Sequence, residues 1–455
     1  MRTETETVIR RLPSLPSLLT LLTLLTATAL LAPRPARAEP CVPIPGARCD
    51  AETTLAQQPD LATILAAVQD RNPALREARA RADAADARVG VAGALPDLEL
   101  KGELWGVPLA HPLAFDMSNT IMIGLRQSFP AWGSLDARAR AARADALAAE
   151  DAVRARQQEL AAEARRAFAA YFRADQEARM HLEHAGLMSR SIETARGQYA
   201  LGRGTQQDIL RLQAELSRLH AEVTAVEQQR SSARALLNAL MARPPDATLG
   251  PAPDINFTQA MAGAADDAAA APAGERGLDE RRPELAAAAR AVTRTEAALD
   301  ASKRDANLPA VMIGADYWYM PTFETRHGYG AMLTVSLPWL NPRHRAEVRS
   351  AERQLAAERS ALDAQRASAR AQLYDAAARL RAARAALGIL HGRVLPDARR
   401  AYEAAEAQLQ SGHGDVTVLL EAARAYLAAR IDEVRAIADV EASRADYARA
   451  AGEPR

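Results

Sequence analysis

The sequence has few aromatic residues, few cysteines and no excess of charge of either sign. Aromatic residues make up 4% of the 455 positions, which argues against a thick globular core and favours long helices with seams of small residues. The 57 basic residues balance the 57 acidic ones, so the total charge shows no nucleic-acid footprint. No hydrolase, zinc or phosphate-loop constellation is present, because the paired glycines lack a following Lys-Ser or Lys-Thr.

Only the N-terminus contains a long apolar run. Arg10 and Arg11 precede an apolar segment over 18–32, and Ala36-Arg37-Ala38 offers a small-x-small cleavage site. This pattern predicts a signal peptide over 1–38, with an uncleaved anchor as the alternative. A flexible tail over 39–58 follows.

The tail contains both cysteines of the chain, Cys41 and Cys49. In an oxidising compartment they are candidates for a disulfide, and two unpaired thiols are the alternative. The residues before Cys41 do not resemble a lipidation site, so we expect no lipid anchor.

The most informative feature is an internal repeat. Gln198, Gly202, Gly204 and Leu210 recur 210 positions later, as Gln408, Gly412, Gly414 and Leu420. Helical patterns open at Asn72-Pro73 and at Arg282-Pro283, again 210 apart, and Pro130 is echoed 208 positions later by Pro338. We therefore predict two repeats, 59–242 and 282–451, joined by a Pro- and Gly-rich connector over 243–281.

Each repeat contains a helical pattern too long for an ordinary globule, which predicts helical hairpins over 134–242 and 343–451. Apolar residues follow a heptad spacing, which is typical of antiparallel coiled coils. In the first repeat they are Ile209, Leu212, Leu216, Leu219, Val223 and Val226; in the second, Leu373, Leu380, Leu387 and Val394, then Leu420, Leu427, Ile431, Val434 and Ala438.

Period-two alternation predicts two strands before each hairpin, over 97–107 and 119–129 and over 310–319 and 329–338. Each has the length that a tilted membrane strand needs. All four tryptophans, Trp105, Trp132, Trp318 and Trp339, fall in or beside these strands, as expected of membrane-interface aromatics. The alternative is that they anchor the core of a small soluble sheet.

Four strands are too few to close a barrel, and lipid tolerates no exposed sheet edge. Three copies of the chain would pool twelve strands, an even number within the range of outer-membrane barrels. The fold class that we predict is mainly α with a small membrane β-part: a trimeric β-barrel on a long α-helical barrel.

The duplicated plan, the strand-to-Pro corners at Phe129-Pro130 and Leu337-Pro338, and the turn beginning at Tyr199 resemble the TolC-like outer-membrane efflux channels. The resemblance implies a homotrimer in the outer membrane of a Gram-negative bacterium, with a large periplasmic part. It also implies docking to a periplasmic adaptor and an inner-membrane pump of the RND or another type, contact with outer-membrane lipid, and no catalysed reaction or cofactor.

By the same resemblance, the glycine turns are periplasmic tips where an adaptor docks. The tip residues would be Gly202, Gly204, Thr205, Gly412, Gly414 and Asp415. Asp208 and Glu421, just beyond the turns, are the constriction candidates, with solvated helix flanks as the alternative. Val418 stands where some members of the family have a second acid.

The exported substrate is the least determined part. The pattern resembles the heavy-metal branch of the family, and the strand regions hold Met117, Met122, Met312, Met320 and Met332, whose thioethers are soft metal ligands. Methionines also fill strand faces without any such role. The eight histidines show no ligand spacing, and we expect His181 and His184 at the surface.

Two other functions compete with the channel. A periplasmic adaptor also uses helical hairpins, but adaptors carry one hairpin between lipoyl-like β halves, whereas strands here interrupt two hairpins. A soluble coiled-coil scaffold would leave the strands and tryptophans unexplained.

Overall fold

The computed structural model describes residues 48–106, 118–262, 275, 277–320, 327–411 and 414–453. The chain divides into two compact units, Met1–Thr53 and Thr54–Arg455, and the long helices and the sheet belong to the second. The predicted signal peptide, Cys41, Met117, Gly412 and the side chain of Cys49 lie outside the described part of the chain. No helix in the described ranges combines the length and the apolarity that a membrane span requires.

The elements follow one order twice: helix, two strands, long helix, turn, helix. The first set comprises α2 (Arg48–Gln57), α3 (Leu61–Arg71), α4 (Pro73–Gly93), β1 (Glu99–Trp105), β2 (Thr120–Phe129), α5 (Ser134–Ala200) and α6 (Gln206–Leu240). The connector contributes α7 (Phe257–Met261) and α10 (Leu278–Arg281). The second set comprises α11 (Pro283–Asn307), β3 (Val311–Tyr319), β4 (His327–Val335), a 3₁₀ turn (Pro338–Leu340), α12 (Pro342–Ile389), a π-turn (Leu390–Val394), α13 (Leu395–Gln410) and α14 (Val416–Ala451).

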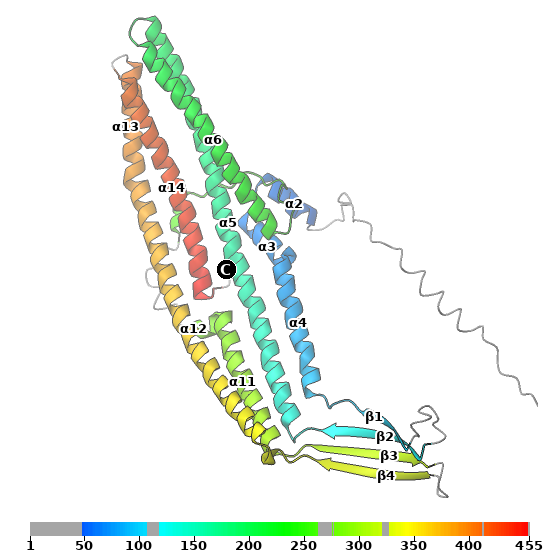
Figure 1. The fold of residues 1–455 in the computed structure, drawn as a ribbon. Coiled ribbons are helices and arrows are strands. Elements are labelled where there is room, and N and C mark those ends of the chain that lie inside the picture. Colours follow the sequence, from blue (N-terminus) through cyan, green and yellow to red (C-terminus); the bar gives the residue numbers. More distant parts are fainter. Residues whose placement is uncertain are drawn as a thin grey trace, which may run out of the picture. The chain divides into compact units, whose positions relative to one another are not determined.

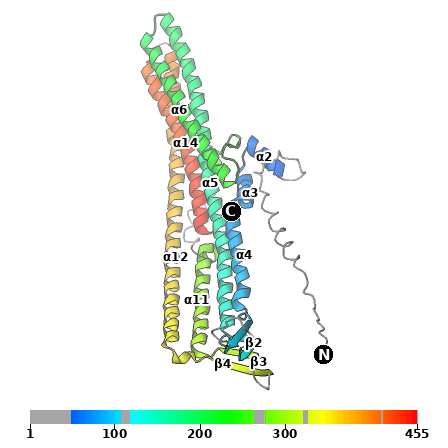
Figure 2. The same cartoon turned by 45° about the vertical axis from the view of Figure 1, so that its right-hand side comes forward.

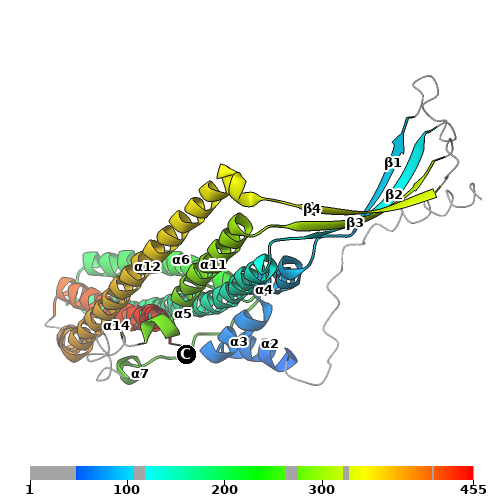
Figure 3. The same ribbon diagram turned by 90° about the horizontal axis from the view of Figure 1, so that it is seen from below.

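The four strands form one antiparallel sheet in the order β1-β2-β3-β4, so β2 and β3 join the two repeats at its centre. The sheet lies at one end of the long helices (Figure 1), and seen from below it extends away from them (Figure 3). β4 ends earlier than predicted, at Val335 instead of residue 338. Pro338 explains the difference, because it has no amide hydrogen for a ladder and opens the 3₁₀ turn.

The long helices run side by side away from the sheet (Figures 1 and 2). α5 is a single α-helix of 67 residues, and α6 folds back along it as a hairpin. α13 and α14 form the second hairpin, and both turns lie at the end opposite the sheet (Figure 1). Local sequence sets where helix α4 begins. The Asn72 side chain caps α4 by accepting a hydrogen bond from Ala74 N, and Pro73 occupies the first turn of the helix.

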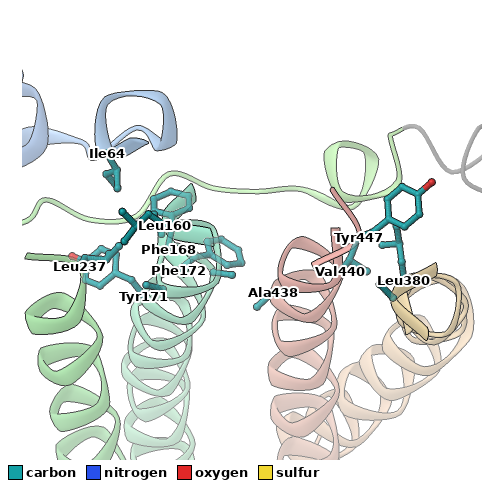
Figure 4. Packing of buried hydrophobic residues seen from close by; sticks show 14 of the residues in the cluster. Ile64, Leu160, Phe168, Tyr171, Phe172, Leu237, Leu380, Ala438, Val440 and Tyr447 are labelled. Atoms are coloured by element: carbon teal, nitrogen blue, oxygen red, sulfur yellow. The ribbon is translucent and has the colours of Figure 1, made fainter. Parts of the chain in front are cut away.

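Two apolar clusters hold the helices together. The larger lies midway along them, where Tyr171 on α5 faces Leu237 on α6 and Phe172 points to the other side of α5, toward Ala438 on α14 (Figure 4). The smaller lies nearer the turns and includes Met188, Leu212 and Leu419. Thin seams of alanine and leucine connect them, as the composition predicts.

The heptad series are confirmed except at one position. Leu373, Leu380 and Leu387 are buried, but Val394 is 41% exposed. The π-turn Leu390–Val394 is the reason, because it inserts a residue and rotates the helix beyond it. The surface position predicted for His181 and His184 is wrong: both are buried between α5 and its neighbours.

Candidate functional site

One face of the sheet is apolar and uncovered in the described part of the chain. The strand register aligns Leu100 with Leu125, and Leu125 with Ala315, and the same face continues through Ile123, Tyr317 and Leu333. The large side chains on this face are exposed on every strand: Leu100 and Leu104; Ile123 and Leu125; Ile313 and Tyr317; Tyr329, Leu333 and Val335. A contiguous apolar face of this kind marks a membrane or protein contact.

The opposite face is polar. It contains Lys101, which forms an ion pair with Glu103, as well as Arg126 and Asp316. Asp316 lies over Gly124, where a Cβ atom would collide with its carboxylate. The methionines of the described strands, Met122, Met312 and Met332, are on this face too. A sheet that is apolar on one side and polar on the other is the pattern of a strand set between lipid and an aqueous lumen.

Two of the four tryptophans lie on the polar face of the sheet and not on the apolar face. Trp105 and Trp318 share the polar face, since they alternate with Leu104 and Tyr317. Trp105 Nε1 donates to Glu103 Oε2 at 3.1 Å. The register therefore contradicts a place for these two in an aromatic belt on the apolar face.

The Trp318 ring covers the backbone of β4 at Gly328 and Gly330, where a Cβ atom would meet the ring at 2.1 and 2.7 Å. Trp132 and Trp339 are exposed and lie at the junctions between strands and long helices, where an interfacial role stays a prediction.

The first turn is built from two helix caps. Gly202 has a φ of +72°, which favours glycine, and Arg203 N donates to Gln198 O at 2.9 Å as α5 ends. Thr205 then caps α6: its side chain accepts from Asp208 N at 3.3 Å, and Asp208 Oδ2 accepts from Thr205 N at 3.0 Å. This reciprocal capping box fixes the turn and engages one carboxylate oxygen of Asp208, Oδ2.

The second turn has different chemistry at the matching positions. Asp415 caps α14 by accepting from Thr417 N at 2.7 Å, and this hydrogen bond holds the pKa of Asp415 below its usual value. Gly414 lies where a Cβ atom would be 2.5 Å from Leu409 N, so the backbones approach too closely for another residue.

Equivalent apolar positions are buried beside one turn and exposed beside the other. Leu409 and Leu420, at the second turn, are 3% and 7% exposed. Their counterparts 210 positions earlier, Tyr199 and Leu210, are 51% and 56% exposed. The first hairpin covers the second within the chain, and nothing in the described residues covers the first in the same way.

Side chains near the turns bind the two hairpins to each other. Gln198 Nε2 donates to Leu409 O, and Arg211 Nη1 donates to Thr417 Oγ1 at 2.8 Å. Farther from the turns, Arg424 Nε donates to the buried Glu215 at 2.9 Å, and this hydrogen bond lowers the pKa of Glu215. These contacts hold the ends of α13 and α14 against α5 and α6.

A pair of buried histidines lies beside the Glu215 ion pair. His181 Nδ1 is 3.4 Å from Glu222 Oε2, and burial lowers the pKa of His184. The sequence analysis named both but expected them at the surface, although the predicted hairpin pairs this stretch of α5 with the stretch of α6 that holds Glu215 and Glu222. The described residues hold no group of three or more His, Cys, Asp or Glu side chains arranged for a metal ion.

The two constriction candidates differ in their surroundings. Asp208 forms the capping box with Thr205, so a role in the turn explains its presence at this position. Glu421 is exposed on α14, six residues beyond the Asp415 cap, and Val418 beside it is exposed as well. Of the two residues, Glu421 is the more exposed, and no hydrogen bond of the turn engages its carboxylate in the described part of the chain.

Comparison with known proteins gives the same outline. A family model described as "outer membrane efflux protein" matches residues 64–243 and 277–453, which are the two repeats. None of the curated proteins compared with the chain matches it.

Solved structures with the same fold include the outer-membrane channel OprN, with 18% identity and a TM-score of 0.69 over 91% of this chain and 98% of that one. CusC, whose structures are described in terms of transmembrane channel formation, has 18% identity and a TM-score of 0.74 over 86% and 92%. The open state of the MtrE outer membrane channel of Neisseria gonorrhoeae has 18% identity and a TM-score of 0.65 over 87% and 89%.

Proposed function

Because the chain belongs to the outer membrane efflux protein family, we propose that it is the outer-membrane duct of a tripartite efflux system. Three copies would pool their sheets into one barrel and their hairpins into one periplasmic tube, through which cargo leaves the cell. The duct is passive and catalyses no reaction. A periplasmic adaptor and an inner-membrane pump would supply selection and energy.

The observation that carries the proposal is the uncovered four-stranded sheet. Its apolar face exposes large side chains on every strand, while its polar face holds Lys101, Glu103, Arg126 and Asp316. β1 and β4 are its outer strands, so their outward edges are open to further pairing. Lipid favours the apolar face and forbids open edges, which a ring of several copies resolves.

The hairpins support the same assembly independently. Leu409 and Leu420 are covered by the first hairpin of their own chain, whereas Tyr199 and Leu210 are exposed at the equivalent positions. In a ring of alternating hairpins, the second hairpin of a neighbouring copy would cover them. We therefore place the subunit contact of the tube at this face of α5 and α6.

For the turns we propose docking of the adaptor. The backbone there is fixed by the Thr205 and Asp415 caps, and Leu201 beside the first turn is 72% exposed. A rigid, partly apolar helix end suits a helical partner. Replacing Leu201 with Glu should abolish adaptor capture by the purified channel and leave its oligomeric state unchanged.

Glu421 is our candidate for the constriction. Threefold symmetry would bring three copies of this exposed carboxylate around the axis, which favours cations. Glu421→Ala should weaken block of the single-channel current by divalent cations in planar bilayers, with Glu193→Ala, exposed on α5, as the control. Equal block in both variants would remove Glu421 from this role.

As cargo we propose soft metal cations. The support is that Met122, Met312 and Met332 share the polar face of the sheet, which would line the lumen. Replacing all three with Leu should lower silver tolerance of cells that depend on this duct, without changing potassium conductance. Unchanged silver tolerance would favour organic cargo.

Fractionation tests the function as a whole. An SDS-resistant trimer recovered from outer membranes, which forms ion-conducting pores in planar bilayers, is the expected result. Soluble periplasmic protein without pores would instead favour the adaptor or scaffold alternatives.

A further inference from the structure

The two long helices of the repeats differ in continuity. α5 runs from Ser134 to Ala200 as one uninterrupted α-helix. Its counterpart is divided into α12 and α13 by the π-turn Leu390–Val394. The second hairpin therefore has a change in helical geometry midway along, which the first hairpin lacks.

Local sequence explains the π-turn. Pro396 has no amide hydrogen to donate to Gly392 O, and its ring crowds that carbonyl in a regular α-helix. The wider turn gives the ring room and adds one residue. As a result the buried seam passes from Leu387 to Tyr402, fifteen positions on, instead of continuing through the exposed Val394.

An inserted turn of this kind is a weak point in a long helix. π-turns commonly occur at functional sites, and they are one of the recognised causes of helix kinks. Bending at Leu390–Val394 would move α13 and the start of α14, while the uninterrupted α5 stays straight. The turn at residues 411–415 would shift relative to the turn at 201–205.

The π-turn is held from outside by the connector between the repeats. The His391 ring stacks on Phe257 of α7, with ring centres 3.9 Å apart and planes 7° from parallel. His391 Nδ1 also lies 2.6 Å from Glu433 Oε1 on α14. One side chain of the π-turn thus contacts both the connector and the neighbouring helix.

α7 is itself fastened to the helices that flank the π-turn. Arg444 Nη2 on α14 donates to Ala260 O at 2.8 Å and to Ala262 O at 3.1 Å. Arg384 Nη2, on α12 just before the π-turn, donates to Ala262 O at 3.2 Å. α7 together with its C-cap residue Ala262 therefore bridges α12, the π-turn and α14.

We propose that the π-turn is a hinge for the second hairpin, and that α7 is a clamp that holds the hinge through Phe257 and His391. This rests on the proposed function in one respect: the motion would regulate the width of the duct at the turns. The hinge joins α12 to α13, with α14 following by gentle curvature. Release of the clamp would let the second turn move away from the first.

Electron–electron distance measurement within one chain tests the hinge. Spin labels would be placed at Leu201→Cys and Val418→Cys, both at exposed positions, in a full-length chain carrying Cys41→Ser and Cys49→Ser. Labelled subunits are diluted with unlabelled ones so that each distance comes from one chain. Phe257→Ala should broaden the distance distribution at least about twofold, and the exposed neighbour Thr258→Ala should leave it narrow.

A repaired helix provides the decisive comparison. Deleting Gly392 together with Pro396→Ala makes the π-turn α-helical and restores fourteen positions between Leu387 and Tyr402, so the seam keeps its phase on both sides. Phe257→Ala in this background should give the narrow distribution again. Equal widths for Phe257→Ala and Thr258→Ala, or broadening that persists in the repaired helix, would overturn the proposal.

His391→Gln guards against misfolding of the Phe257 variant, because His391 is partly exposed and its loss leaves no cavity. It should broaden the distribution as Phe257→Ala does, and an unbroadened distribution counts against the clamp. These distances do not depend on conductance. Failure of the duct would instead appear as the absence of a trimer from outer membranes, so the two failures are distinguishable.

Discussion

Arg424 on α14 donates hydrogen bonds from Nε and Nη2 to the two carboxylate oxygens of Glu215 on α6. The Glu215 side chain is 5% exposed and that of Arg424 is 50% exposed, so the pair closes the seam between the hairpins from its solvent side. A bidentate pair of this kind fixes the distance and the angle between two helices. Arg435 on α14 forms a similar pair with the buried Glu177 on α5.

Glu215→Gln should lower the free energy of unfolding by about 1–2 kcal/mol, because a neutral amide can accept only one of the two hydrogen bonds and leaves Arg424 uncompensated. Urea denaturation followed by circular dichroism measures the change. Glu193→Gln, which breaks the exposed pair with Arg196, is the matched control and should cost less than about 0.5 kcal/mol. Equal losses for the two variants would show that the interhelix pair has no special weight.

His184 on α5 should make the stability of the packed hairpins fall in mild acid. Burial lowers the pKa of His184, which faces His181 on α5, Glu215 and Glu222 on α6, and Arg430 on α14. The unfolded chain then binds the proton more readily than the folded one. The contribution to stability is full above the ordinary pKa of 6.5 and is lost as the pH falls below it.

Replacing His184 with Gln should flatten the dependence of the urea midpoint on pH between about 7 and 5. His220→Gln, at an exposed position on α6, is the control and should retain the slope of the unmodified chain. If both variants keep the same slope, the acid sensitivity lies elsewhere.

The glycines of the two turns should differ in their tolerance of a side chain. A Cβ at Gly414 would be 2.5 Å from Leu409 N, whereas at Gly204 the nearest atom would be 3.4 Å away. Gly414→Ala should therefore destabilise the second turn by about 1–3 kcal/mol, and Gly204→Ala should change little. Protease cleavage at the turns of the folded protein measures this: the Gly414 variant should be cut faster. Equal cleavage would mean that the second turn relaxes freely.

The sheet offers a similar comparison. A Cβ at Gly330 would be 2.7 Å from the Trp318 ring, but nothing lies within 4 Å at Gly102 on the other face. Gly330→Ala should displace the ring, lower the melting temperature of the assembled protein and shift its tryptophan fluorescence. Gly102→Ala should preserve both properties. The same shift in both variants would indicate that Trp318 does not rest on β4.

Regular patterns account for what the sequence predicts well. Alternation and heptads place all four strands and both hairpins within a few residues, because one buried face leaves little freedom of register. The turn at Gly202 could be predicted because glycine readily adopts a positive φ, as Gly202 does, and few other residues do. The tip and docking roles given to the residues beside the turns stay predictions, because they depend on partner molecules and not on the periodicity of this chain.

The π-turn was not predicted, because Val394 continues the heptad series in the sequence although the regular α-helix is interrupted at Leu390–Val394. A faint signal exists: the spacing between the repeats grows from 208 at Pro130 and Pro338 to 210 at the glycine turns, so the second repeat holds two extra residues in between. The face of Trp105 and Trp318 was not predicted for another reason. Grouping the tryptophans by type overrode the alternation that sets Trp318 opposite Tyr317.

The open edges of the sheet have a consequence for how the protein is made. A lone copy has no low-energy place in a bilayer, because each unpaired backbone group on β1 and β4 costs several kcal/mol in hydrocarbon. In the proposed duct, copies would therefore have to pair their strand edges before or while they enter the membrane. The rate of insertion would then rise more steeply than in proportion to the supply of chains, so a modest change in expression would produce a large change in the number of assembled ducts.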